Sequence, residues 1–258
     1  QRAGVDDDRA VTLLTALHAL GLVTRDGEAY ANSPAASTFL SKSGRHDFGD
    51  YLRFQIDRQM YPFLEQLEPA VAGRLAPDTV DSYEKWMSDP EEARLYSASQ
   101  HAGSLSPGKA LARIADLSEA RSLLDVGGGT GAFAISLCKA NPALHATIVD
   151  FPNVATVGRE FIAEAGLSQR IRYLEGNALE VAWPGGQDAI VMSYLFSSIP
   201  GDAIADVVER AREALVPGGQ LFVHDFMVNP DRSGPKLAAL WQLQHTAFNP
   251  QARSVSTD

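Results

Sequence analysis

The sequence has little cysteine, few basic residues and no long apolar run. Cys138 is the single cysteine among 258 residues, which excludes an internal disulfide and favours a reducing, cytoplasmic location. No apolar stretch approaches the ~18 residues that cross a bilayer, so we expect no membrane span. Lysine and arginine number 22 against 32 aspartate and glutamate, a net charge of −10. Because a chain this acidic repels a phosphate backbone, we do not expect nucleic acid as a partner.

Length and composition nevertheless allow a substantial interior. With 45% hydrophobic residues over 258 positions, the chain can bury one sizeable core and one smaller core. The segment Gly103–Gly108 combines glycine, serine and proline, which is typical of a linker. We therefore predict two domains, 1–103 and 104–258.

The N-terminal segment has a helical pattern followed by a short hairpin. Asp6–Asp8 offers caps for a helix with apolar residues three and four positions apart, and Gly21 ends it. The stretch 22–30, with Asp26-Gly27 at its centre, predicts two short strands. Helix and hairpin together outline a winged-helix fold. Three aspartates at the helix entry disfavour DNA binding by this segment.

The stretch 123–131, Leu-Leu-Asp-Val-Gly-Gly-Gly-Thr-Gly, carries the most information about function. It predicts a buried strand that ends in a glycine-rich turn, followed by a helix whose N-terminal amides face the same crevice. Glycine lets the backbone approach a ligand closely. Gly127, Gly129 and Ala132 also satisfy the looser dinucleotide pattern, so the turn alone leaves both NAD and S-adenosylmethionine open.

Strand and helix patterns alternate after this turn. We predict strands over 145–149, 170–174 and 189–194, a helix over 202–215 stopped by Pro217-Gly218-Gly219, and a fifth strand from Leu221 to Asp225. This alternation predicts a parallel sheet with helices on both faces. Asp150, at the end of the second strand, can accept hydrogen bonds from both hydroxyls of a ribose.

Four motifs occur in an order that resembles a known family. They are Asp125–Gly131, Asp150–Pro152, Gly176–Ala178 and Arg212–Gly219. In these residues the chain is similar to S-adenosylmethionine-dependent methyltransferases of the two-domain small-molecule type, which includes plant caffeate and hydroxyindole O-methyltransferases and bacterial tailoring enzymes. The resemblance implies methyl transfer to an aromatic or conjugated small molecule in secondary or pigment metabolism, with O-methylation expected and C- or N-methylation open.

The resemblance also implies an architecture. Residues 104–258 would form a Rossmann-like α/β methyltransferase domain, mostly of parallel sheet, and residues 1–103 a winged-helix-like domain that forms a homodimer and walls the substrate pocket. Held against the family, the chain lacks helices before Gln1 and a final helix and strand pair after Asp258, so we expect it to be truncated at both ends.

Cofactor-binding residues follow from the resemblance, position by position. Asp150 would hold the ribose, and Phe151 and Tyr194 would lie against the adenine. Asn177 stands where relatives carry aspartate, and its amide keeps an acceptor for the adenine amino group. The full expected set is Asp125, Gly127, Gly129, Gly131, Asp150, Phe151, Asn177, Ala178 and Tyr194.

The residue that would accept a proton departs from the family pattern. Relatives carry histidine after the fourth strand where this chain has Ser197, and a serine without an activating partner is no base near neutral pH. His101 and His245 are the candidate replacements. Alternatives are an acceptor that needs no strong base, a protein that hydroxylates or decarboxylates, a non-catalytic binder of the cofactor, or an NAD-dependent oxidoreductase.

A pocket for a flat acceptor is expected from apolar and aromatic residues. The expected substrate-binding residues are Phe54, Met60, Gln100, Phe196, Ser197, Trp241 and Asn249. His224, Asp225 and His245 could be taken for a metal-ligating set. Because adjacent strand residues point to opposite faces, we expect no metal there.

Overall fold

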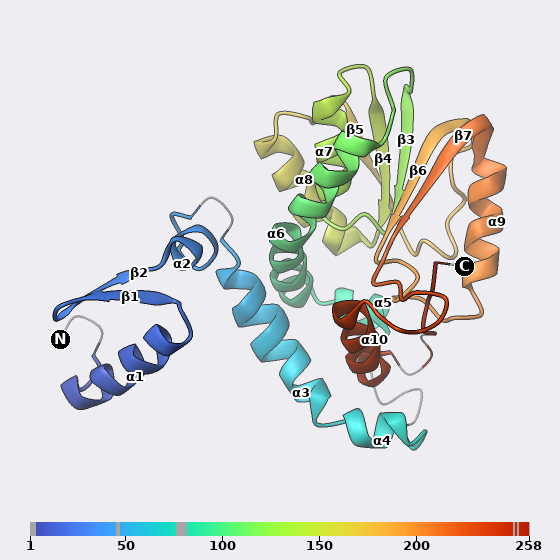
Figure 1. Ribbon diagram of the computed structural model, residues 1–258. Helices are drawn as coiled ribbons and strands as arrows, with labels where there is room; N and C mark the ends of the chain where they lie inside the picture. Colours follow the sequence, from blue (N-terminus) through green and yellow to red (C-terminus); the bar gives the residue numbers. More distant parts are fainter. Residues whose placement is uncertain (1–3, 45–46, 76–81, 250, 252, 258) are drawn as a thin grey trace.

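The computed structural model describes residues 4–44, 47–75, 82–249, 251 and 253–257. Its centre is a five-stranded sheet in the order β5-β4-β3-β6-β7, with every neighbouring pair parallel (Figure 1). The strands are β3 (Ser122–Val126), β4 (His145–Asp150), β5 (Ile171–Glu175), β6 (Gln187–Ser193) and β7 (Leu215–His224). The expected α/β fold with a parallel sheet is confirmed.

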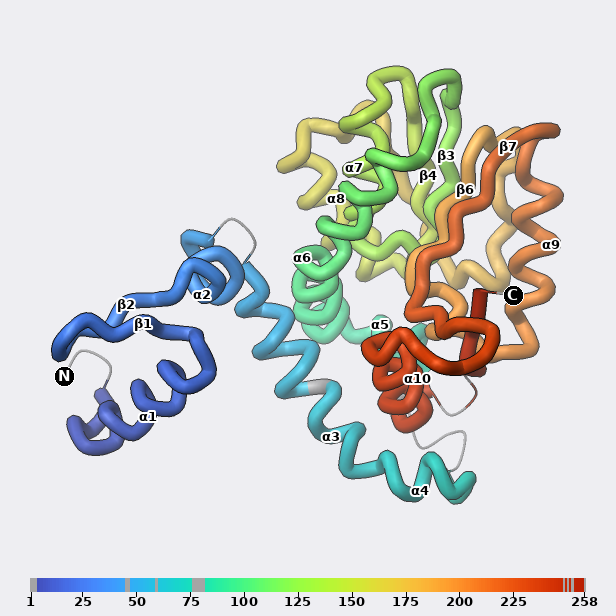
Figure 2. The backbone as a smooth tube through the Cα atoms, in the orientation of Figure 1, coloured from blue at the N-terminus to red at the C-terminus, as the bar shows by residue number. Residues whose placement is uncertain are grey.

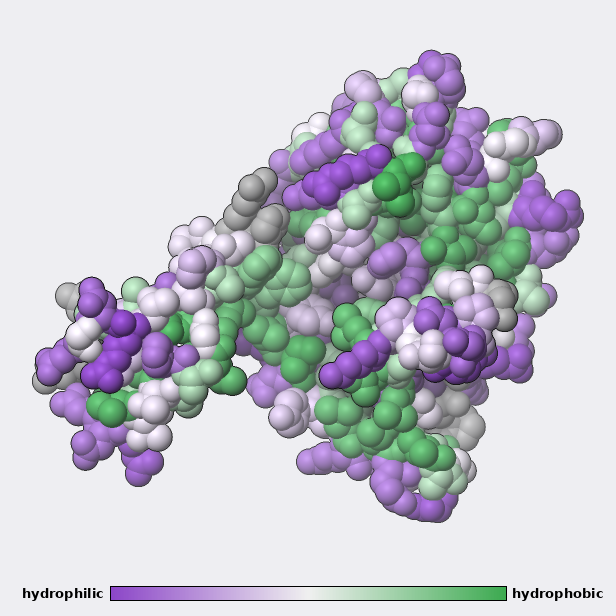
Figure 3. Space-filling view, in the orientation of Figure 1, coloured by the Kyte–Doolittle hydropathy of each residue, from purple (hydrophilic) through white to green (hydrophobic). Residues whose placement is uncertain are grey.

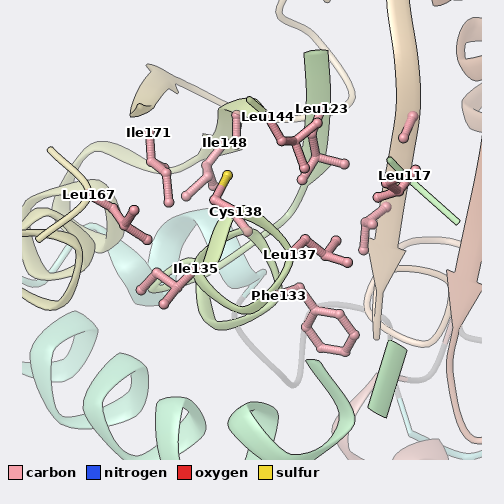
Figure 4. Packing of buried hydrophobic residues seen from close by; sticks show 14 of the residues in the cluster. Leu117, Leu123, Phe133, Ile135, Leu137, Cys138, Leu144, Ile148, Leu167 and Ile171 are labelled. Carbon is pink, nitrogen blue, oxygen red and sulfur yellow. The ribbon is translucent and has the colours of Figure 1, made fainter. Parts of the chain in front are cut away.

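Helices cover both faces of the sheet because its strands are apolar on both sides. Leu123 packs on one face with residues of α7 (Ala132–Ala140) and α8 (Pro152–Glu164). Figure 4 shows this cluster around Leu137 and Ile148. Leu124, its neighbour along the strand, packs on the other face with α9 (Ile204–Ala214). Alternating side chains along each strand thus anchor the two helical layers.

The N-terminal segment forms a lobe to one side of the sheet layers (Figure 2). It contains α1 (Asp7–Ala19), β1 (Val23–Asp26), β2 (Ala29–Asn32) and α2 (Pro34–Phe39). The Asp6 carboxylate caps α1 by accepting hydrogen bonds from the Asp8 and Arg9 amides, and β1 pairs with β2 antiparallel. The expected helix and hairpin are confirmed. No residue of α1 is buried, so the described chain leaves this helix uncovered.

Helical segments connect this lobe to the sheet. They are the π-helix η1 (Tyr51–Met60), α3 (Tyr61–Leu64), α4 (Leu67–Val71), α5 (Tyr83–Met87) and α6 (Pro90–Ile114). After the sheet, α10 (Lys236–Phe248) packs back against α3 and α4. Leu237, Leu240 and Leu243 of α10 are exposed, and Figure 3 shows apolar surface in this region. None of the described helices combines the length and apolar character needed to cross a membrane.

The predicted linker at Gly103–Gly108 is wrong. These residues lie inside α6, a continuous helix of 25 residues with Pro107 in its interior. Gly108 is required for packing within this helix. A Cβ at position 108 would lie only 3.0 Å from the Ala132 carbonyl oxygen and 3.2 Å from the Phe133 Cα. Glycine therefore serves close packing of α6 on α7 rather than flexibility. The boundary predicted at 103/104 falls within this helix.

The last strand also begins earlier than predicted. The helix ends at Ala214, and β7 starts at once with Leu215 instead of Leu221. Pairing with β6 shifts register from Gln187 opposite Leu215 to Ala189 opposite Gln220. The residues Pro217-Gly218-Gly219 therefore form a bulge within the strand, where glycine accommodates the irregular backbone.

Candidate active site

A cavity of about 550 Å³ opens at the carboxyl ends of the sheet strands. This edge is where parallel α/β sheets bind ligands. The cavity receives residues that follow every strand of the sheet, together with side chains from η1, α5, α6 and α10. Of the predicted site residues it is lined by Gly127, Gly129, Asp150, Phe151, Asn177, Ala178, Tyr194, Met60, Gln100, Ser197, Trp241 and His245.

The glycine-rich turn after β3 is held open by hydrogen bonds to its backbone. The Gly129 amide donates to Asp150 Oδ2 at 2.7 Å, and the Gly129 carbonyl accepts from the Tyr173 hydroxyl at 2.7 Å. Gly129 has φ +57°, and a Cβ there would meet no atom within 4 Å. The backbone of the turn is therefore bare toward the cavity, which permits close approach of a ligand.

Asp150 places a carboxyl group beside this turn. Its Oδ1 accepts from the Phe151 amide at 2.8 Å. Burial nevertheless raises the pKa of Asp150 to about 6, because the two backbone hydrogen bonds only partly offset the loss of water. The carboxylate lines the cavity with free acceptor capacity for ligand hydroxyls.

Asp125 and Gly131 lie beneath the turn rather than in the cavity lining. Asp125 is fully buried and its Oδ2 accepts from the Ala134 amide at 3.2 Å. Burial raises the pKa of Asp125 to about 7. Gly131 has φ +79°, and a Cβ there would lie 2.7 Å from Ile148 Cδ1. Both residues support the turn from below.

The side-chain amide of Asn177 forms hydrogen bonds with other residues of the protein. Its Nδ2 donates to Glu84 Oε2 at 3.0 Å, and its Oδ1 accepts from the Leu179 amide at 3.0 Å. Glu84 lines the cavity beside it. The acceptor that the sequence led us to expect at Asn177 is therefore already engaged once.

His245 is the one candidate base that lines the cavity. Its side chain, 7% exposed, comes from α10 and stacks on Trp241 at a centroid distance of 6.5 Å. Burial lowers the pKa of His245, while the nearby Asp225 carboxylate and a hydrogen bond with the Ser197 backbone act in the opposite direction. Asp225 is itself fixed by the Ser197 amide at 3.0 Å. The imidazole of His245 is therefore neutral near pH 7, and the Asp225 carboxylate lies nearby.

His101, the other candidate, is not among the residues that line the cavity. Its Nδ1 lies 2.7 Å from Thr130 Oγ1, and its ring stacks on Phe161 with a centroid distance of 3.9 Å. Burial lowers the pKa of His101 to about 4. His101 thus contacts the glycine-rich turn through Thr130.

Three expected substrate residues also lie outside the cavity lining. Phe196 packs in the core with the α9 face of the sheet. Asn249 ends α10, where its side chain accepts from the Gln251 amide at 3.2 Å. Phe54 lies on η1 but does not contribute to the lining. These residues were expected from their residue types and their positions in relatives, which do not show which side chains face the cavity.

Several lining residues had no sequence signal that singled them out. These are Gln55, Tyr83, Glu84, Gln244 and Phe226. Tyr83 forms hydrogen bonds with Tyr96 and Ser198, which tie α5 to α6 and to the segment after β6. A five-residue helix has too few turns for a periodic pattern, so its inward face could not be predicted.

The charge of the lining is one-sided. Glu84 and Asp150 contribute carboxylates, whereas no lysine or arginine occurs among the described lining residues. Aromatic side chains also line the cavity, among them Tyr51, Tyr96 and Phe226, which stacks on Trp241 with centroids 4.3 Å apart. The cavity therefore suits a cationic or neutral occupant with flat apolar surface.

Comparison with known proteins identifies the family to which this architecture belongs. Residues 76–255 match the model of the O-methyltransferase domain. The chain belongs to the O-methyltransferase family. It is thereby an S-adenosylmethionine-dependent methyltransferase, and the expected enzyme class and cofactor are confirmed.

Individual relatives agree with this assignment. The chain is 29% identical over 243 residues to a 3-hydroxy-5-methyl-1-naphthoate 3-O-methyltransferase of Streptomyces sahachiroi, covering 94% of this methyltransferase and 70% of that protein. It is 34% identical over 226 residues to the N,N-dimethyltransferase OxyT of Streptomyces rimosus, covering 86% and 65%. The chain thus spans about two thirds of the length of these relatives.

A solved structure shows the same fold. The human N-acetylserotonin methyltransferase in complex with S-adenosylmethionine superimposes with a TM-score of 0.84 at 20% identity, covering 98% of this chain and 74% of that one. At this identity the likeness establishes the architecture.

The residues of this methyltransferase fit its cofactor. The volume lies within the range of about 300–1,000 Å³ usual for small-molecule sites. The bare glycine backbone, the Asp150 carboxylate and the absence of lysine and arginine from the described lining suit an adenosyl group with a cationic sulfur.

Proposed function

We propose that this methyltransferase methylates a hydroxyl group of a neutral aromatic or conjugated small molecule, with His245 as the proton acceptor. The observation that carries the proposal is that His245, the stacked rings of Phe226 and Trp241, and the glycine-rich turn line a single cavity. The naphthoate O-methyltransferase supports a ring hydroxyl as acceptor by its similarity. Because the naphthoate in its name carries a carboxylate, the neutral charge proposed here rests on the lining of this cavity and not on that relative.

Each part of the cavity has a distinct task in this proposal. Gly127, Gly129 and Asp150 bind the cofactor, and Phe151 and Tyr194 pack on its flat base. The bound cofactor supplies a methyl group that is already strongly electrophilic. The protein therefore needs to orient the acceptor, exclude water and receive one proton.

Proton removal is assigned to His245. A neutral imidazole would accept the hydroxyl proton as the acceptor oxygen bonds to the methyl carbon, while the bond from that carbon to the cofactor sulfur breaks and S-adenosylhomocysteine leaves. The Asp225 carboxylate then stabilises the imidazolium that forms, since its charge raises the pKa of His245. Trp241 and Phe226, stacked on one another, hold a flat ring in the same part of the cavity.

The charge of the lining supports a neutral acceptor. An anionic group buried here would lie near Glu84, Asp150 and Asp225 without a lysine or arginine from the described lining to pair with it. Burial of an unpaired charge is costly. An acceptor with hydroxyl or carbonyl groups can instead bond to the amides of Gln55, Gln100 and Gln244.

Replacement of His245 by alanine tests the base assignment. We expect methyl transfer to fall by about 10²–10⁴-fold while S-adenosylhomocysteine still binds. His145→Gln, at an exposed position on β4, serves as control for loss of an imidazole. Because burial lowers the pKa of His245, the wild-type rate should persist below pH 6.5 and fall only at more acidic pH. An unchanged rate in His245→Ala would contradict the assignment and favour an acceptor that needs no base.

Two further proposals concern the whole protein. We propose a homodimer formed through the N-terminal lobe, which is supported by α1 with Val11, Leu13 and Leu20 exposed. Light scattering on the purified protein should give the mass of two chains.

A cytoplasmic location is proposed as well, supported by the single free thiol of Cys138.

A further inference from the structure

Glu84 and Asn177 form a hydrogen-bonded pair at one end of the cavity. Asn177 follows β5, and Glu84 lies in the first turn of α5, 93 residues earlier in the chain. Both line the cavity. The pair therefore joins an edge of the sheet to a helix that covers it.

The position of this pair along the sheet edge indicates which part of the cofactor it meets. The strand order places the glycine turn after β3, Asp150 at the end of β4 and Asn177 after β5. Neighbouring strands are about 4.8 Å apart. If Asp150 holds the ribose, the base extends one strand further and reaches the Glu84–Asn177 pair.

The hydrogen-bond inventory distinguishes the two side chains. Asn177 donates through Nδ2 to Glu84 at 3.0 Å and to Glu180 at 3.4 Å, and its Oδ1 accepts from the Leu179 amide. Its hydrogens are thus spent on carboxylates. Glu84 uses Oε2 for this contact, and within the described part of the chain no donor reaches Oε1. The unused strong acceptor of the pair lies on Glu84.

Anchors on both sides fix the position of Glu84. Its neighbour Tyr83 forms hydrogen bonds with Tyr96 and Ser198. At the far end of α5, the Met87 carbonyl accepts from Asn153 Nδ2 at 3.0 Å. A carboxylate on so constrained a helix loses little freedom on binding a ligand.

We propose that Glu84 is the residue that recognises the adenine amino group, with Asn177 as the positioning residue that orients it. This inference rests on the proposed cofactor site and names a recognition residue within it. A carboxylate accepts a hydrogen bond from the exocyclic amino group of adenine and repels the carbonyl oxygen of hypoxanthine. An amide at 177 suits this role because a second carboxylate, 3.0 Å away, would repel Glu84.

The test compares two ligands by calorimetry: S-adenosylhomocysteine and S-inosylhomocysteine, in which a carbonyl replaces the amino group. Wild-type protein should prefer the adenosyl ligand by about tenfold or more. In Glu84→Gln that preference should fall to within about threefold, because an amide can serve either ligand. Glu180→Gln is the control. Glu180 also accepts from Asn177 but does not line the cavity, so this variant should keep the wild-type preference.

The reverse substitution at the partner supplies an independent readout. Asn177→Asp places two carboxylates together, and we expect it to weaken S-adenosylhomocysteine binding about tenfold. Stronger binding in Asn177→Asp, or an unchanged preference in Glu84→Gln, would overturn the role of Glu84 while leaving the cofactor site intact. Failure of the wild type to bind S-adenosylhomocysteine would instead contradict the proposed function itself.

Discussion

Asp125 and Asp150 are two acids near the glycine-rich turn whose pKa values the fold raises. Both lose water on folding, and the pKa rises to about 7 for Asp125 and to about 6 for Asp150. They differ in what surrounds them. Asp150 faces the cavity and accepts two backbone hydrogen bonds, whereas buried Asp125 accepts one through Oδ2, and its Oδ1 has no donor among the described residues. The first is poised to bind a ligand, and the second carries a cost in stability.

Asp125 should make the free energy of unfolding depend on pH. A carboxyl whose pKa is higher in the folded state stabilises the fold below its unfolded value near 4, and this stability is lost as the pH rises through about 7. The wild-type protein should lose about 3 kcal/mol of its free energy of unfolding between pH 5 and pH 8 through Asp125, and Asp125→Asn should not show this loss. Urea unfolding of both proteins at the two pH values checks it. Parallel pH profiles for the two proteins would contradict a perturbed Asp125.

Asp150 should make cofactor binding depend on pH in the opposite sense. Ribose hydroxyls donate to the ionised carboxylate, so affinity for S-adenosylhomocysteine should fall as the pH drops below about 6. Asp150→Asn should bind more weakly at pH 7.5, by about tenfold, and should lack the acid limb. Calorimetry from pH 5 to 7.5 measures both effects. A flat wild-type profile would remove Asp150 from the ribose contact.

Among the elements, α6 shows how packing decides what a glycine does. Gly103 and Gly108 lie in the same helix, but only the second presses on another helix. A Cβ at Gly103 would have the Tyr51 ring as nearest neighbour at 3.8 Å, whereas at Gly108 it would lie 3.0 Å from Ala132 oxygen and Ser136 Oγ. The same substitution should therefore have opposite effects at the two sites.

Gly108→Ala should destabilise the protein, by about 1–2 kcal/mol, because α6 or α7 must move away from the contact. Gly103→Ala is the matched control and should stabilise by up to about 1 kcal/mol, since alanine favours a helix. Thermal or urea unfolding compares the pair. Equal shifts in both variants would show that contact with α7 is not what requires glycine at 108.

The strands of the sheet could be predicted from sequence because their apolar runs are short and bounded by turn residues. β4 ends at Asp150 as expected, and β3 leads directly into its glycine turn. The structure of Gly103–Gly108 and the start of β7 could not be predicted from sequence. The same pattern of glycine and proline occurs in loops, at close helix contacts and in strand bulges. Only the neighbouring backbone at Gly108 and the shifted register opposite Gln187 distinguish these cases.

Across the whole molecule, one cavity unites segments that are far apart in the chain. Residues that follow the strands could be predicted to lie together because a parallel sheet brings its carboxyl ends together, and most of them line the cavity. The acceptor side was predictable only in part: Met60, Gln100 and Trp241 line it, but Tyr83 and Glu84 enter from a short helix without periodic pattern. Which of two histidines faces the cavity depended on the packing of α6 and α10.

The central claim is that this cavity methylates a neutral aromatic hydroxyl. The most direct measurement follows the labelled methyl group of S-adenosylmethionine into matched acceptors: hydroxyarenes and the same rings bearing a carboxylate. We expect transfer to hydroxyl oxygen, with kcat/KM for the neutral members higher by about tenfold or more, since the described lining offers no cation to a buried carboxylate. Preference for the carboxylates, or binding of cofactor with no label transferred across the neutral panel, would contradict it.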